Sequence, residues 1–455
     1  MKLLRLLPLL LFISMPARGQ SPDVQAQPGM LSDDGGLTMP AILSMRERAA
    51  VIDRMLEDRL RTVVPALMDR EQVDLWIIAA REYNEDPVVR TMLPATWLAA
   101  RRRTVLVLHR TDSGVEGLAV ARYAVGPLFE AAWDPEEQPD QWQRLADLVA
   151  DRDPERIAIN VSETFALGDG LTHSEYQGLT AALAPRFRDR LVSGDRLSVG
   201  WLETRTALEM EMYPHIVRIA RTIIREGFSD QAISPGVTTT DDVVWWYRDR
   251  IRDLGLITWF HPSVSVQRAE TGGRDDDFSS RPDAAVIRRG DLLHVDFGIT
   301  YLRLNTDTQQ HAYVLRHGET DAPQGLRHAL AVGNRLQDVL TDEFEEGRSG
   351  NQILAAALAQ AAAEGIRATI YTHPIGFHGH GAGPTIGLWD QQGGVPGRGD
   401  YPLFANTAHS IELNAVVAVP EWGKDVRIML EEDAIFDGRT TTYIDPRQER
   451  MYLIR

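Results

Sequence analysis

The sequence has no cysteine among its 455 residues, and only two lysines, Lys2 and Lys424. The lack of cysteine excludes disulfides, thiolate zinc sites, iron–sulfur clusters and cysteine nucleophiles. Because nearly all positive charge is arginine, the lysine of a phosphate-binding loop or of a Schiff-base enzyme is almost excluded as well. The motifs Gly-x-Ser-x-Gly and His-Glu-x-x-His and the glycine triplet of dinucleotide-binding folds are also missing.

What is present is an ordinary globular composition with an acidic balance. Hydrophobic residues make up 44% and charged residues 25%, and the length suits two domains. The net charge of −17 disfavours nucleic acid and anionic membranes as partners. We therefore expect no nucleic-acid partner and no stable membrane insertion.

The N-terminus has the features of a signal peptide. Lys2 and Arg5 precede an apolar run over residues 6–15, and small residues flank Arg18 at a cleavage site after Gly19. Residues 1–19 are predicted to be removed, which makes the protein secreted or periplasmic. An N-terminal anchor or a buried strand is the alternative interpretation. Residues 20–38 are rich in Gly, Pro, Asp, Ser and Gln and predict a disordered leader.

In the rest of the chain, the order of helical and β-rich segments predicts two domains of different secondary-structure pattern. Residues 41–70 show helical spacing, and short β-rich runs at 73–80, 104–108, 117–121 and 156–161 alternate with helical stretches, which indicates an α/β domain over 39–203. From 204 to 455 we expect an α+β domain. A long helix is expected after residues 199–206 and is broken at residues 234–236. The other expected helices cover residues 241–254, with Thr240 as N-cap, 325–345 and 351–364, and the expected strands cover residues 292–301, 311–316, 410–419 and 426–436.

Two aspartates mark the start of a possible metal site. Asp296 and Asp307 are eleven residues apart, a spacing that a hairpin can bring side by side. Asp296 interrupts an apolar strand, where an unpaired carboxylate would be costly. A cation would satisfy it, and an arginine partner or a turn hydrogen bond would do so as well.

Further ligand candidates follow in three short stretches. His373, His378 and His380 lie among four glycines, and glycine lets backbone approach a ligand closely. Glu412 and Glu431 interrupt β-type runs, where a solvent-facing side chain is the usual interpretation. Because side chains alternate along a strand, only one of the neighbours Glu431 and Glu432 can be a ligand. Such acids with a histidine, and without sulfur, suit two divalent ions: Mn²⁺, Co²⁺, Fe²⁺ or Zn²⁺.

This ordered set resembles the pita-bread metallopeptidases, which include methionine aminopeptidase, Xaa-Pro aminopeptidase, prolidase and the metal-free creatinase. The resemblance covers residues 205–455, and the upstream region is similar to a creatinase-type N-terminal domain in position and texture. It implies an α+β protein, with a C-terminal pita-bread fold after a smaller α/β domain. It also implies two metal ions, with manganese expected and cobalt, zinc or iron as alternatives.

The resemblance assigns roles residue by residue. Asp296 and Asp307 would hold one ion, with Asp307 bridging; His380 and Glu412 would hold the other, and Glu431 would bridge both. His380 is chosen because residues 379–383 fit the family's Gly-His-Gly-x-Gly, with His378 as its rival. A hydroxide bridging the ions would attack the scissile carbonyl, and Glu412 would carry the proton to the leaving nitrogen.

The sequence also departs from the family. The family's histidine 17 or 18 residues before the first metal aspartate is missing, since residues 275–280 contain none. A second family histidine is missing from residues 384–390. His261, His373 or His378 could replace these groups in space.

We therefore expect an exported dinuclear metallohydrolase that cleaves short peptides, an Xaa-Pro-type aminopeptidase or dipeptidase, with a homodimer as the expected oligomer. The alternatives are a pita-bread hydrolase acting on a non-peptide C–N bond and a peptide-binding module without catalysis.

Overall fold

The computed structural model describes residues 38–270 and 284–455. The predicted signal peptide and nearly all of the predicted leader lie outside the described residues, as does the stretch 275–280 that lacks the family histidine. The boundary expected between residues 203 and 204 stays a prediction. Within the described residues, no helix has the length and apolar content that a membrane span requires.

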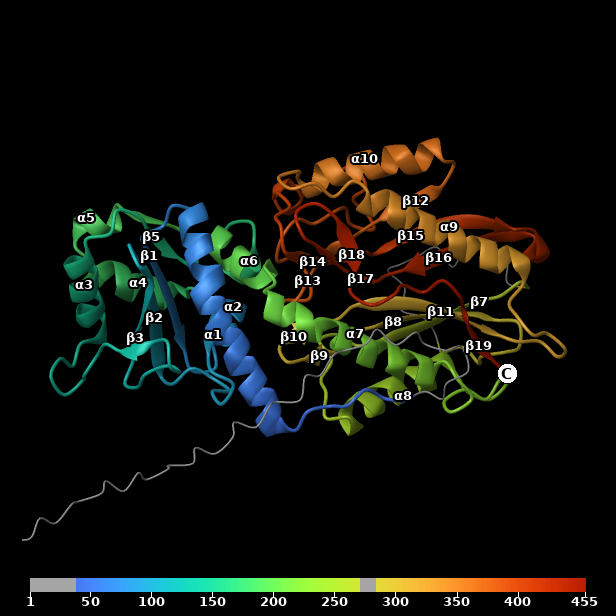
Figure 1. Cartoon of the computed structure of the whole chain (residues 1–455), viewed down its shortest axis with the longest axis horizontal. Coiled ribbons are helices and arrows are strands. Elements are labelled where there is room, and N and C mark those ends of the chain that lie inside the picture. Colours follow the sequence, from blue (N-terminus) through green and yellow to red (C-terminus); the bar gives the residue numbers. More distant parts are fainter. Residues whose placement is uncertain (1–37, 271–283) are drawn as a thin grey trace, which may run out of the picture. The chain divides into compact units, whose positions relative to one another are not determined.

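The first part of the chain folds around a six-stranded mixed sheet (Figure 1). Its strand order is β4-β3-β2-β1-β5-β6, with β1 antiparallel to β2 and parallel to β5. The strands are β1 (Leu75–Arg81), β2 (Arg103–Thr111), β3 (Gly114–Val120), β4 (Glu130–Ala131), β5 (Ile157–Ile159) and β6 (Leu191–Ser193). This is the α/β arrangement that the alternating pattern predicts.

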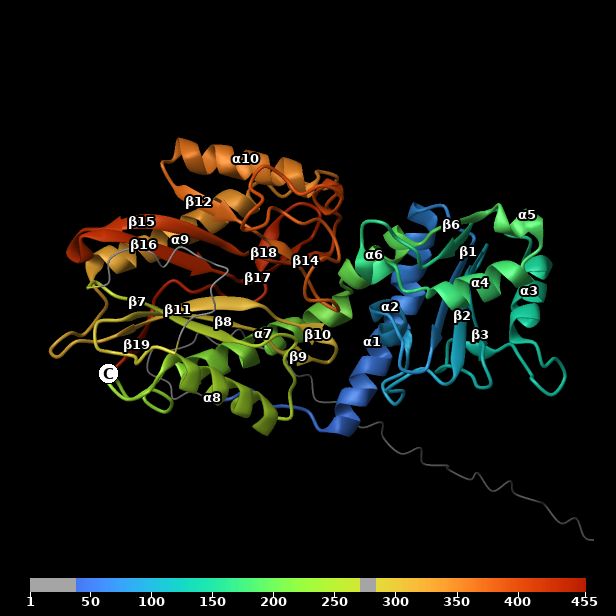
Figure 2. The same ribbon diagram turned by 180° about the vertical axis from the view of Figure 1, so that it is seen from behind.

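Helices cover both faces of this sheet (Figure 2). One face carries α1 (Met45–Arg70), α2 (Pro87–Met92) and α6 (Asp195–Glu203), and the other carries α3 (Gln141–Arg152), α4 (His173–Ala182) and α5 (Pro185–Arg188). Because side chains alternate along β1, Trp76 and Ile78 pack under the first set and Leu75 and Ile77 under the second. A short 3₁₀ helix, η1 (Ala166–Gly168), lies in the connection between β5 and α4.

Helix α1 contributes to two hydrophobic cores. Its N-terminal turns place Val51 and Met55 in the core built around α7 (Ala207–Gly227) and α8 (Thr240–Asp253). Its later turns pack against the six-stranded sheet. Between the two, Arg59 is fully buried and pairs with the carboxylate of Glu209 at 3.0 Å. Its guanidinium also donates to the carbonyl oxygens of Trp201 and Thr204.

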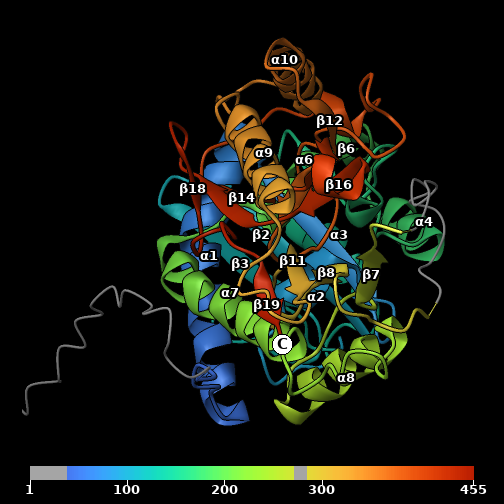
Figure 3. The same ribbon diagram turned by 90° about the vertical axis from the view of Figure 1, so that its right-hand side faces the viewer.

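In the second part of the chain, helices pack in pairs on the outer faces of β-sheets (Figure 3). Helices α7 and α8 pack on the sheet β19-β11-β8-β7, and helices α9 (Gln324–Thr341) and α10 (Gly350–Ala363) pack on the sheet β12-β15-β16. A third sheet has the order β13-β14-β17-β18. The strands are β7 (Ser263–Gln267), β8 (Leu292–Phe297), β11 (Thr308–Val314), β12 (Arg367–Ile370), β13 (His373–Ile375), β14 (Thr407–Ser410), β15 (Leu413–Val419), β16 (Lys424–Leu430), β17 (Asp433–Phe436), β18 (Thr441–Tyr443) and β19 (Tyr452–Ile454).

The remaining short elements of this part are β9 (Thr300–Tyr301), β10 (Leu304–Asn305), η2 (Arg398–Asp400) and η3 (Pro420–Trp422). Strands β9 and β10 form the turn of the hairpin that joins β8 to β11. The turn reverses the chain direction, so that Asp296 on β8 and Asp307 at the start of β11 lie close together.

Three sequence-based boundaries need correction. The N-cap of α8 is Thr239 and not Thr240, because the Thr239 hydroxyl and the Asp242 carboxylate form a capping box. The expected strand 410–419 is divided at Ile411 and Glu412, and the expected strand 426–436 is divided at Glu431 and Glu432. In both cases the chain crosses between the β12-β15-β16 sheet and the β13-β14-β17-β18 sheet. Both candidate glutamates therefore lie at crossings between sheets and not within strands.

Candidate metal centre

The two aspartates are brought together by β8 and β11. Asp296 lies near the end of β8 opposite Gln309, and Asp307 directly precedes β11. The backbone amide of Asp307 donates to the Asp433 carboxylate at 3.3 Å, and the Ser410 hydroxyl donates to both Asp433 and the carbonyl oxygen of Asp307. These contacts fix the backbone from which the Asp307 carboxylate projects.

The two glutamates enter from the sheet crossings. Glu431 is 1% exposed and pairs through its backbone with Gln309, whose own amide donates to the Glu431 carbonyl at 3.0 Å. Glu432 points away: its carboxylate accepts from the Gln310 side chain at 3.1 Å and from the Gln448 amide at 2.9 Å. Glu431 therefore belongs to the cluster and Glu432 to the packing behind it.

His373 lies among these acids. Its Nδ1 donates to the Pro374 carbonyl at 2.9 Å, which leaves Nε2 facing the cluster. That Nε2 lies 3.2 Å from Glu431 Oε1, 3.5 Å from Asp307 Oδ2 and 3.8 Å from Glu412 Oε2.

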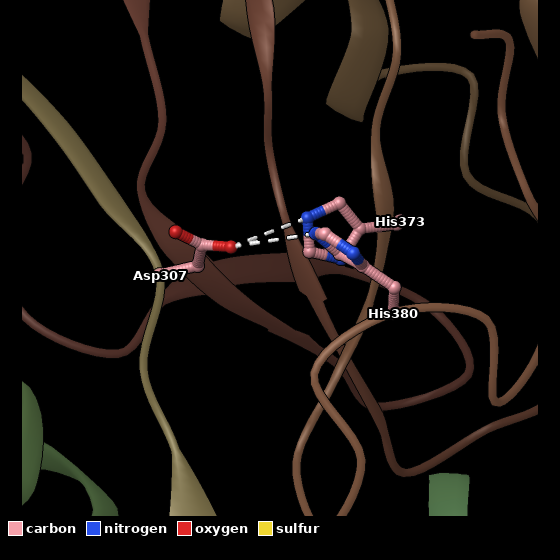
Figure 4. Close-up of side chains that lie close together, drawn as sticks. All are labelled: Asp307, His373 and His380. Atoms are coloured by element: carbon pink, nitrogen blue, oxygen red, sulfur yellow. Dashed lines mark ion pairs between the residues drawn. The ribbon is translucent and has the colours of Figure 1, made fainter. Parts of the chain in front are cut away.

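His380 lies at the outer edge. Its side chain is 63% exposed, and its Nε2 is 3.9 Å from Asp307 Oδ2. Its ring meets the edge of the Trp259 indole at a centroid distance of 4.8 Å. Figure 4 shows both imidazoles directed at the carboxylate of Asp307, with His373 behind His380.

The chemistry of this donor set fits divalent cations. Four atoms of the cluster are buried: Asp296 Oδ1, Asp307 Oδ1, Glu431 Oε1 and His373 Nε2. Apart from the 3.2 Å approach of the last two to each other, none of them has a hydrogen-bond partner. Buried carboxylate oxygens without partners are costly unless a cation neutralises them. Three sets of donor atoms, each within 4.8 Å, could hold an ion: Asp296, Asp307 and Glu431; His373, Glu412 and Glu431; and Asp307, His373 and His380.

Charge crowding perturbs these groups strongly in the metal-free protein. Burial, followed by the charge of Glu431, raises the pKa of Asp296 and of Asp307 well above its usual range. The same two causes raise the pKa of Glu412. Burial would lower the pKa of His373, but hydrogen bonding to Glu431 and the nearby carboxylates outweigh it and raise that pKa to about 9. Although the His380 side chain is 63% exposed, desolvation beside the cluster, followed by the positive charge of His373, lowers its pKa to about 3.

All five residues that the resemblance assigns to metal lie in this cluster, and His373 lies in it with them. His378 and His261 belong to none of the three donor sets. Burial lowers the pKa of His378. His261 accepts from Arg248 at 3.0 Å and packs against Trp245.

Three residues at the site were not predicted from the sequence. They are Gln309, which contacts both glutamates, Asp433 beneath Asp307, and Trp259 beside His380. Strand alternation from Asp307 would have placed Gln309 on the same face. No comparable pattern marks Trp259, which comes from a loop.

The fold and this donor set define the class of metal-dependent hydrolases. Residues 212–433 match the sequence model of metallopeptidase family M24. This match lies in the C-terminal part of the chain, and the protein is a metallopeptidase by class. A search of curated protein sequences gives no match.

Solved structures share the fold over almost their whole length. The X-Pro aminopeptidase of Thermotoga maritima aligns with a TM-score of 0.58 at 16% identity, covering 85% of this chain and 99% of that one. The Xaa-Pro dipeptidase of Bacillus anthracis gives 0.55 at 16%, with coverages of 90% and 100%. The prolidase of Pyrococcus furiosus gives 0.52 at 14%, with 84% and 99%. The expected pita-bread fold behind a smaller N-terminal domain is confirmed.

Proposed function

We propose that the protein is a dinuclear metallopeptidase that cleaves short peptides at Xaa-Pro bonds, as an aminopeptidase or a dipeptidase. One observation carries this proposal: buried donor atoms of Asp296, Asp307, Glu431 and His373 come together from two sheets and a crossing between sheets, and those of the two aspartates have no hydrogen-bond partner. Buried carboxylates crowded in this way are costly unless cations neutralise their charge. The shared fold with an X-Pro aminopeptidase and an Xaa-Pro dipeptidase supports the substrate class.

We assign the histidine ligand to His373, with His380 at the outer edge of the centre. The Nε2 of His373 is buried and faces Asp307, Glu412 and Glu431, whereas His380 approaches only Asp307. His380 is then free to meet the substrate, with Trp259 as its aromatic neighbour. Manganese is the expected metal, with cobalt, zinc or iron as alternatives, because the donors are oxygen and imidazole without sulfur.

The acidic side chains of the cluster have separate roles in this mechanism. Bound divalent ions would supply activation of a water molecule and stabilisation of negative charge on the carbonyl oxygen. Glu412 is the only acid of the cluster that is partly exposed and near His373, so its carboxylate is placed to pass a proton to the leaving nitrogen. Asp296, Asp307 and Glu431 would hold the ions, whose positive charge would offset the cost of keeping these crowded carboxylates ionised.

The deciding experiment joins metal analysis to a panel of substrates. Purified protein is analysed for bound metal, stripped with chelator and reconstituted with Mn²⁺, Co²⁺, Zn²⁺ or Fe²⁺. Each form is then tested against X-Pro dipeptides, X-Pro tripeptides and matched X-Ala peptides. We expect cleavage that requires metal and prefers proline in the second position. A protein that binds two ions but cleaves none of these peptides would contradict the substrate class.

That outcome would favour the second candidate, a hydrolase of another C–N bond. Its support is the sequence departure at residues 384–390, where the family's second histidine is replaced. Hydantoins, amides and lactams of small size would then be the compounds to screen.

We also propose that the mature protein begins near Gln20, is secreted or periplasmic, and is a homodimer. The positive start, apolar run and small-residue cleavage site are the reasons for export. Mass spectrometry of protein purified from its native host should find residues 1–19 removed. An intact leader in soluble protein would contradict export, and a monomeric mass by light scattering would contradict the dimer.

A further inference from the structure

Gln309 holds both glutamates of the candidate centre with one side-chain amide. It is 3% exposed and lies on β11 between the two sheet crossings. Its Nε2 donates to Glu412 Oε1 at 2.5 Å and to Glu431 Oε2 at 2.9 Å. The two hydrogens of the amide are thereby both used, one on each carboxylate.

A buried histidine fixes the orientation of this amide. A carboxylate that binds metal can only accept hydrogen bonds, so the NH₂ group and not the carbonyl oxygen of Gln309 must face the glutamates. The carbonyl oxygen then lies 2.9 Å from His294 Nε2, which must donate to it. His294 is itself held by Ser265, whose hydroxyl lies 3.5 Å from Nδ1, and by stacking on His311.

The direction of these hydrogen bonds determines which glutamate oxygens are left for the metal centre. Donation runs from His294 to Gln309 and from Gln309 to both glutamates, so each glutamate is kept as an acceptor on one oxygen. The other oxygens, Glu412 Oε2 and Glu431 Oε1, face His373 at 3.8 and 3.2 Å. Gln309 therefore fixes the rotation of both carboxylates and directs their free oxygens into the cluster.

We infer that Gln309 is a positioning residue for the metal centre and that His294 holds it in place. The inference rests on the proposed metal-dependent function, because hydrogen bonds that orient these two glutamates have a purpose only if the glutamates carry charge. Groups that hydrogen-bond to metal ligands typically contribute about 10- to 100-fold to metal affinity or activity.

The neighbouring residue provides a matched control. Gln310 is fully buried on the opposite face of β11, where its side chain donates to Glu432 at 3.1 Å and accepts from the Tyr452 hydroxyl at 2.6 Å. It has the same size, the same strand and the same kind of glutamate partner as Gln309. It differs in that its partner Glu432 faces away from the cluster.

The test compares Gln309→Met with Gln310→Met, since methionine keeps the length of the side chain and removes the amide. Full-length protein is stripped of metal and titrated with Mn²⁺ by calorimetry, and the melting temperature of each metal-free variant is recorded. We expect Gln309→Met to weaken Mn²⁺ affinity by about 10- to 100-fold with unchanged stoichiometry at saturation. We expect Gln310→Met to lower the melting temperature but to keep the wild-type affinity.

A kinetic arm separates positioning from substrate binding. At saturating Mn²⁺, Gln309→Met should lower kcat and leave KM near its wild-type value, because Gln309 contacts no open surface. His294→Leu, which leaves the amide free to rotate, should weaken Mn²⁺ affinity in the same direction and by less. If Gln309→Met fails to give a cooperative melt, His294→Leu decides the question.

Wild-type Mn²⁺ affinity in both Gln309→Met and His294→Leu would overturn the inference. An equal loss of affinity in Gln309→Met and Gln310→Met would also overturn it, because the effect would then come from packing. If the wild-type protein binds Mn²⁺ but cleaves no X-Pro peptide, the proposed substrate fails alone, and the Mn²⁺ titrations still decide the role of Gln309. If the wild-type protein binds no divalent ion, both fail.

Discussion

Replacing His373 should change both the strength and the pH dependence of metal binding. In the metal-free protein the surrounding carboxylates raise the pKa of His373 from 6.5 to about 9. Its protonation therefore stabilises the metal-free fold fully below pH 6.5, and that contribution is lost as the pH rises through 9. A cation that takes Nε2 as a ligand must first displace this proton.

The magnitude follows from that pKa. Between pH 6 and 8, both below 9, losing one proton makes apparent affinity rise about tenfold per pH unit, so about 100-fold in total or about 2.7 kcal/mol. Asp296, Asp307 and Glu412 have raised pKa values as well, so their protons can only steepen the dependence. His380, with its pKa lowered to about 3, is already neutral and adds nothing.

The assay is Mn²⁺ titration of metal-free protein at several pH values from 6 to 8. His373→Ala should bind more weakly, and the slope of log affinity against pH should fall by about one relative to the wild type. His380→Ala is the matched control and should keep the wild-type slope and stoichiometry. The reasoning is refuted if His373→Ala keeps both affinity and slope while His380→Ala loses metal, in which case the two histidines exchange roles.

Three further predictions concern neighbouring groups. Elemental analysis should find metal lost from Asp307→Ala and Glu431→Ala but retained in Glu432→Ala, and retention in the first two would refute the ligand assignment. Chelation should lower the melting temperature, since metal at 100 times its dissociation constant contributes about 2.7 kcal/mol, and an unchanged melting curve would argue against a bound ion. Glu209→Gln leaves Arg59 buried without its countercharge and should cost about 3–5 kcal/mol in denaturant unfolding, whereas a cost near zero would show that water reaches the pair.

The acids of the centre could be proposed from the sequence because their positions depend on local geometry. Asp296 and Asp307 are joined by a hairpin, so their approach follows from strand pairing over eleven residues. The opposite directions of Glu431 and Glu432 follow from alternation and appear in their different partners. Helix α9 and helix α10 also begin and end close to their predicted limits.

The position of His373 could not be read in the same way. It faces the cluster because β13 places it opposite Ser410, which lies opposite Asp433 on β17. That register joins segments far apart in the chain. The path from His373 to His380 passes through Gly376, which has a positive φ, and Gly381, which directly follows His380, has a positive φ as well. Neither the register nor the path is encoded in a periodic pattern. The breaks in the two predicted strands cannot be predicted from the sequence for the same reason. An apolar run has the same pattern whether it stays in one sheet or crosses to another.

Helix α1 contributes residues to two hydrophobic cores, and this affects how the protein unfolds. Residues from one helix complete the core under α7 and α8 as well as the core under the six-stranded sheet. A chain shortened to begin at residue 204 would lose Val51 and Met55 from the first core and would leave Glu209 buried without Arg59. Heating should therefore melt both halves in one calorimetric transition, and limited proteolysis within α1 should release neither half as a stable fragment. We therefore expect the C-terminal half to need the N-terminal region in order to fold stably.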